Sequence, residues 1–87
     1  MDYIKIYNKI TDNGKNRLLT GYTETHHIIP KCMGGTNDEW NLVKLTAKEH
    51  FICHLLLCEI YPKNQKLRFA LWNMCNVSRD YQERYKV

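Results

Sequence analysis

The chain has 87 residues, of which 44% are hydrophobic and 25% charged, and its formal net charge is +4. This length and composition predict one small globular domain over residues 1–87. The longest apolar run, residues 55–58, is too short to cross a membrane, and the first residues lack the charged and apolar blocks of a signal peptide. We therefore expect a cytoplasmic protein with no membrane partner.

The basic residues gather towards the two ends of the chain. Residues 1–20 carry four basic and two acidic side chains, residues 21–61 three and five, and residues 62–87 six and two. Basic flanks suit a polyanion, because each lysine or arginine near a phosphate releases counterions. Proteins that never contact nucleic acid have similar charges, so this pattern alone does not show whether the chain binds nucleic acid.

The first predicted element is a short helix over residues 2–10. Its apolar side chains recur at helical spacing, at Tyr3, Ile4, Tyr7 and Ile10. The alternation of Ile4 and Ile6 would also permit a strand. In either case, Asp12-Asn13-Gly14 is typical of a turn and predicts the end of the element.

Two strands are expected next. Residues 22–29 are rich in tyrosine, threonine and isoleucine, which favour a strand, and Pro30 closes it. Residues 31–40 contain Gly34-Gly35 and predict a loop, and residues 41–45 form the second strand. The strand, loop and strand together predict an antiparallel hairpin.

Two helices complete the prediction. Thr46 and Glu49 have the spacing of a capping box, and the helix that follows runs to residue 60 or 61 before Pro62. A last helix over residues 63–76 places its apolar side chains on one face, and a basic tail covers residues 77–87. We expect Trp72 to lie in the small core and Trp40 to cap it, although Trp40 could also stack on a base.

All four histidines fall between the first strand and the second helix. His26 and His27 are adjacent on the strand, so their side chains point to opposite faces. His50 and His54 are four residues apart on one helix face, so both rings can meet a ring from the strand around one metal ion. A fourth histidine nearby can then act as a general base. Taken singly, such histidines are more often solvated or hydrogen-bonded than metal-bound.

The order of these residues is that of a known family. The stretch from residue 24 to residue 57 closely resembles the HNH endonucleases, at His26-His27-Ile28-Ile29-Pro30, Gly34-Gly35, Asn41-Leu42-Val43, Leu45-Thr46, Glu49-His50 and His54. The resemblance implies an α+β fold with a ββα-metal core at about residues 22–61, flanked by an N-terminal and a C-terminal helix. The flanking segments resemble phage-encoded relatives of homing endonucleases.

The resemblance also implies roles for the site residues. His26 and His50 would bind the metal, and His54 resembles a further histidine of the nuclease colicins that helps to bind metal or phosphate. His27 would be the general base, and Asn41 would brace the loop and help to orient His27. Many relatives carry aspartate where this chain has His26, which leaves the metal open among Mg²⁺, Mn²⁺, Ni²⁺ and Zn²⁺.

The resemblance implies hydrolysis of double-stranded DNA with one divalent ion, giving 5′-phosphate and 3′-hydroxyl ends. One such site cuts one strand, so cutting both needs a homodimer or rebinding. We expect four basic residues near the site to contact DNA, namely Lys31, Lys44, Lys48 and Arg68. The alternative is that they are ordinary solvated surface side chains.

Three alternatives stay open at this stage. The same histidines could hold zinc in a DNA-binding module without turnover, or the chain could be an inactive or truncated homing-endonuclease relative. Glu24, two residues before His26, could fix a histidine tautomer or be an exposed strand residue.

Overall fold

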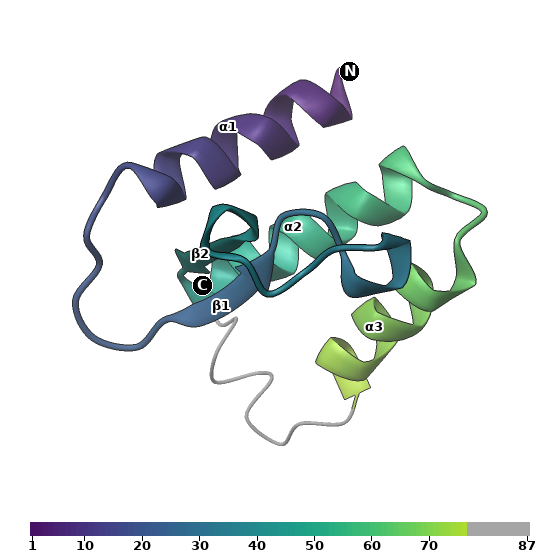
Figure 1. Cartoon of the computed structure of the whole chain (residues 1–87). Helices are drawn as coiled ribbons and strands as arrows, with labels where there is room; N and C mark the ends of the chain where they lie inside the picture. The colour runs from purple at the N-terminus through teal and green to yellow at the C-terminus, as the bar shows by residue number, and fades with distance from the viewer. Residues whose placement is uncertain (77–87) are drawn as a thin grey trace.

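The structure is a computed structural model that describes residues 1–76, so the predicted basic tail lies outside the described residues. It confirms the α+β prediction, with a two-stranded antiparallel hairpin and three helices (Figure 1). The chain order is α1 (Tyr3–Lys15), β1 (Glu24–His27), β2 (Leu42–Leu45), α2 (Ala47–Ile60) and α3 (Gln65–Asn76). Short 3-10 turns, Lys31–Met33 and Glu39–Asn41, lie in the loop between the strands.

The helix α1 is longer than predicted, because Gly14 continues it instead of ending it. A Cβ atom at Gly14 would lie 2.6 Å from Val43 Cγ2 and 2.9 Å from Leu45 Cδ2. The glycine therefore allows a close approach of α1 to β2 and does not form a turn. The sequence rule for a turn at residues 12–14 was wrong, since tertiary packing fixes this glycine.

Both strands are shorter than predicted, at four residues each. His26 pairs with Val43 and His27 with Leu42, where the ladder ends. Beyond that point Ile28 N donates to Asn41 O at 2.8 Å, but Ile29 N donates to the Asn41 side-chain oxygen at 2.7 Å. A side chain thus takes over from the strand ladder, and residue 41 falls in a 3-10 turn instead of the second strand.

The predicted helix starts and ends are confirmed for α2. Glu49 N donates to Thr46 Oγ1 at 3.2 Å, and Thr46 N donates to Glu49 Oε1 at 2.9 Å, which completes the capping box. The helix ends at Ile60, as expected, and α3 lies within the predicted range of residues 63–76.

The core is centred on α2, with α1 and α3 packed against it (Figure 1). One buried cluster joins the three helices, and a second lies under the hairpin: the first holds Tyr7, Leu56, Leu57 and Leu67, and the second Val43, Leu45 and Cys53. No helix within residues 1–76 is long and apolar enough to span a membrane.

Trp72 does not lie in the core as predicted, and Trp40 is also largely exposed. Trp40 is 57% exposed and Trp72 is 55% exposed. Trp72 lies five positions after the buried Leu67 on α3, which is about 140° around an α-helix. When Leu67 points into the core, Trp72 therefore points away from it.

Candidate metal centre

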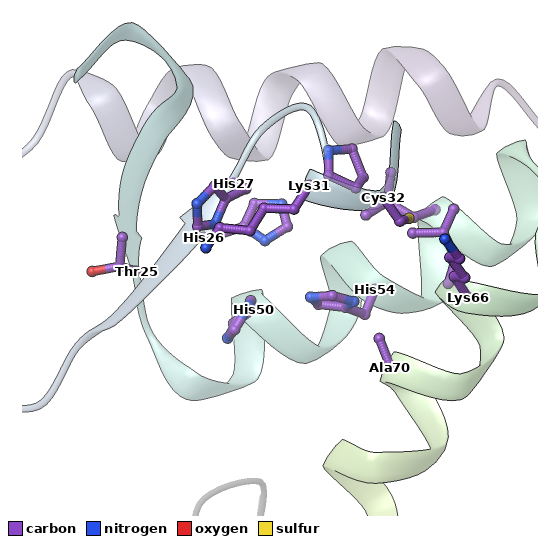
Figure 2. Close-up of a pocket in the computed structure, with 12 residues that line it drawn as sticks. Thr25, His26, His27, Lys31, Cys32, His50, His54, Lys66 and Ala70 are labelled. Atoms are coloured by element: carbon purple, nitrogen blue, oxygen red, sulfur yellow. The ribbon is translucent and has the colours of Figure 1, made fainter. Parts of the chain in front are cut away.

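Three of the four histidines meet where β1 lies against α2. The ring centroids of His26 and His50 are 5.1 Å apart, those of His26 and His54 5.4 Å, and those of His50 and His54 4.9 Å. One ring nitrogen from each lies within 4.8 Å of the other two. Figure 2 shows the His50 and His54 rings on successive turns of α2, both on the side that faces His26. The three could together hold a metal ion.

Two ring nitrogens of this cluster are buried without a hydrogen bond. His26 Nδ1 and His54 Nδ1 have no partner among residues 1–76. A buried nitrogen left unpaired costs free energy, and native proteins rarely leave such groups unexplained. A cation on these nitrogens would supply the missing partners, and three clustered imidazoles are a metal-ligand set, so the residues present fit a metal ion.

The electrostatic environment keeps two of these rings neutral. Burial lowers the pKa of His26 to about 3, with smaller contributions from the neighbouring rings of His54, His50 and His27. Burial also lowers the pKa of His54 to about 4, again helped by His50. Neutral imidazole is the form that binds metals, so the folded chain presents these two side chains ready as ligands at neutral pH.

Glu24 orients the third ring. Its Oε1 lies 2.7 Å from His50 Nδ1, across 26 positions of sequence. The carboxylate accepts a hydrogen bond from Nδ1–H, which leaves His50 Nε2 as the nitrogen that the ring can offer to a cation. A histidine ligand whose other nitrogen donates to a carboxylate is the usual arrangement in metal sites. Of the two readings of Glu24 from the sequence, the structure favours the histidine partner.

His27 stands apart from the cluster, as expected from strand alternation, but lines the same pocket. Its Nε2 lies 2.7 Å from the Asn37 side-chain oxygen. Asn41, which the resemblance implied would orient His27 through a hydrogen bond, makes none to that ring. Its fully buried amide contacts only backbone: it accepts from Ile29 N at 2.7 Å and donates to Ile29 O at 3.1 Å and Thr36 O at 2.8 Å.

The division between the two asparagines has a physical reason. Asn41 lies in a 3-10 turn and not in the strand, and its side-chain amide bonds backbone groups that the strand ladder no longer pairs. Both N–H donors of this amide are then used, and neither is left for His27. It braces the loop, as expected, while the side chain that reaches His27 is Asn37. Sequence reasoning missed Asn37 because it is one of several polar residues in an irregular loop, and nothing in its spacing distinguishes it.

A pocket of about 360 Å³ opens in front of the histidines (Figure 2). Its charged lining residues are Lys31, after β1, and Lys66, on the first turn of α3. Of the basic residues expected to contact DNA, Lys31 is therefore at the pocket. Lys44 does not line the pocket itself, but its Nζ donates at 2.6 Å to Oγ1 of Thr25, which does.

The remaining predicted DNA contacts are exposed but do not line the pocket: Lys48 on α2 and Arg68 on α3. Lys66 was not singled out from the sequence, because its place at the pocket depends on how α3 folds back onto α2. The described pocket lining contains no carboxylate, so its charge is complementary to an anionic ligand.

The chain is similar to several phage proteins that are named as endonucleases. The chain is 50% identical over 88 residues to the probable mobile endonuclease E of Enterobacteria phage T4, an alignment that takes in 100% of this chain and 62% of the relative. It is 56% identical over 80 residues to endonuclease B of that phage (86% of this chain, 30% of the relative) and 47% identical over 85 residues to endonuclease D (92% and 33%).

All three relatives are named probable mobile endonucleases. The chain spans 62% of the length of one of them and about a third of the other two. No protein-family model matches the chain, and no solved structure matches it significantly. The chain is thus similar to the part of these named endonucleases that each alignment covers.

Proposed function

We propose that this chain is a metal-dependent DNA endonuclease of the HNH type. The observation that carries the proposal is the cluster of His26, His50 and His54. Within residues 1–76, two of its buried ring nitrogens are unpaired, and the pocket beside it is lined by lysines and by no carboxylate. The similarity to named mobile endonucleases supports the same class of reaction.

The three clustered histidines would hold one divalent ion. When bound, the ion would act as a Lewis acid that stabilises negative charge developing on the phosphate and on the leaving oxygen. Three imidazoles and no carboxylate form a donor set that suits Zn²⁺ or Ni²⁺ better than Mg²⁺. Three protein ligands also leave a coordination position open, as catalytic sites require.

His27 would act as the general base. Its Nε2 proton is donated to the Asn37 side-chain oxygen, which can only accept. The lone pair of the neutral ring is therefore on Nδ1, the atom that can take a proton from water. Asn37 would hold the ring in this orientation, while Asn41 fixes the backbone that follows both histidines.

Lys31 and Lys66 would bind phosphate groups of the DNA on either side of the reacting one. The products would be 5′-phosphate and 3′-hydroxyl ends. The substrate would be double-stranded DNA, of which one site cuts one strand, so cutting both strands would require a second copy or rebinding.

The test is a plasmid-nicking assay with the full chain in Mg²⁺, Mn²⁺, Ni²⁺ and Zn²⁺. We expect nicking by the wild type, strongest with a transition metal, and its loss in His27→Ala with metal affinity retained. Lys9→Ala, which changes an exposed lysine of α1 that does not line the pocket, is the matched control and should nick normally. Metal and DNA binding without nicking in any metal would contradict the proposal and favour a zinc-stabilised DNA-binding module.

A further inference from the structure

The metal cluster has a buried neighbour from outside the ββα core. Tyr7 of α1 is 4% exposed, and its hydroxyl oxygen lies 2.7 Å from His26 Nε2 and 2.6 Å from Ile28 O. Its ring lies 5.8 Å from the His26 ring, centroid to centroid. The helix and the strand end are therefore joined at one hydroxyl, across 19 positions of sequence.

The proton positions at this hydroxyl follow from the partners. A backbone carbonyl can only accept, so the single hydroxyl proton of Tyr7 is donated to Ile28 O. The hydroxyl oxygen must then accept at its other contact, and the donor there is His26 Nε2–H. A neutral imidazole carries one proton, which places the His26 lone pair on Nδ1.

That Nδ1 is the buried ring nitrogen that has no hydrogen bond among residues 1–76. It belongs to the ring that meets His50 and His54. The Tyr7 hydroxyl thus selects the tautomer whose lone pair is directed away from the tyrosine and is available to a ligand. Glu24 selects the tautomer of His50 in the same way, but there Nδ1 is the protonated nitrogen and Nε2 has the lone pair.

The other contact of the hydroxyl is also at the site. Ile28 follows the two histidines directly, and its N donates to Asn41 O at 2.8 Å. Both backbone polar groups of Ile28 are therefore hydrogen-bonded, its carbonyl oxygen to the Tyr7 hydroxyl and its N–H to the Asn41 carbonyl. This fixes the end of β1, and with it the direction of the His26 side chain.

We propose that Tyr7 is a positioning residue of the metal centre, which holds His26 as the Nε2–H tautomer so that Nδ1 faces a divalent cation. This rests on the metal site of the proposed function. It makes α1 a part of the site, although the strand, loop and helix that resemble HNH endonucleases do not include α1.

The direct test is the tautomer of His26 in the metal-free full chain, read from long-range ¹H–¹⁵N correlations of the ring. We expect a protonated Nε2 and an unprotonated Nδ1 in the wild type. An Nδ1–H tautomer would overturn the proposal, and this measurement does not depend on any variant folding.

The second test is Tyr7→Phe, which removes only the hydroxyl, with Tyr3→Phe as the matched control one helical turn earlier. We expect Tyr7→Phe to mix the two tautomers of His26 and to weaken Co²⁺ binding by about 10–100-fold, the usual effect of losing a hydrogen bond to a metal ligand. Tyr3→Phe should change neither. An unchanged tautomer and Co²⁺ affinity in folded Tyr7→Phe would overturn the role.

The outcomes for Tyr7 and for the proposed nuclease are separable. If Tyr7→Phe binds Co²⁺ more weakly than the wild type but the wild type does not nick plasmid, the positioning role stands and the nuclease function is contradicted. A nicking wild type with normal Co²⁺ affinity in Tyr7→Phe would keep the nuclease and contradict the positioning role. No Co²⁺ binding by the wild type would overturn both.

Discussion

Two asparagines in the loop between the strands should separate stability from catalysis. Asn41 is fully buried and holds backbone groups of Ile29 and Thr36, whereas Asn37 is exposed and contacts His27. We therefore compare Asn41→Ala with Asn37→Ala in the full chain. The first removes a brace of the fold, and the second removes a partner of the proposed base.

The magnitudes follow from the hydrogen bonds lost. Asn41→Ala breaks three bonds to backbone groups, and partly buried groups left unpaired cost about 1 kcal/mol each, so the free energy of unfolding should fall by about 3 kcal/mol. Asn37→Ala changes an exposed residue and should alter that free energy by less than about 0.5 kcal/mol. It loses one orienting bond, which corresponds to a nicking rate lowered by up to about tenfold.

The assays are urea denaturation and plasmid nicking on the same preparations, with Co²⁺ titration as the check on the metal site. Asn37→Ala should bind Co²⁺ normally and nick slowly. The reasoning would be refuted by an Asn37→Ala variant as destabilised as Asn41→Ala, or by an Asn41→Ala variant of wild-type stability.

Three further outcomes are expected. Gly14→Ala should lower the free energy of unfolding by up to about 2 kcal/mol in urea denaturation, because overpacking against β2 costs about 1–3 kcal/mol and the gain in helix propensity returns only about 1 kcal/mol; a stabilised variant would contradict the close approach. Glu24→Gln should weaken Co²⁺ binding by about 10–100-fold, since His50 loses a charged partner, and an unchanged titration would speak against that contact. The metal-free chain should lose stability as the pH falls from about 6.5 towards 4, because the unfolded state protonates His26 and His54 near 6.5 while the folded state resists until about 3 and about 4. Urea denaturation at several pH values with a chelator measures this, and a flat profile between pH 6.5 and 4.5 would count against buried, neutral rings.

The elements that local sequence rules specify were predicted well. The capping box at Thr46 and Glu49 fixes the start of α2, and four-residue spacing on that helix puts His50 and His54 on one face. Because a hairpin and the helix that follows it are close in sequence, the position of His26 beside that pair could be anticipated as well.

Contacts between distant segments could not be predicted. Gly14 has the composition of a turn but serves the packing of α1 on β2, and Tyr7 has the spacing of a core residue but donates to the strand end with its hydroxyl. Lys66 reaches the pocket only because α3 folds back. Periodicity reports which face of an element is buried, and it contains no information on which partner meets that face.

The central claim is that His26, His50 and His54 together bind one divalent ion. It is tested most directly by Co²⁺ titration of the metal-free full chain, followed through the visible absorption of the bound ion. We predict one ion per chain, with binding abolished in His54→Ala and retained in His27→Ala. Binding that survives in His54→Ala, or a wild type that binds no ion, would contradict the account.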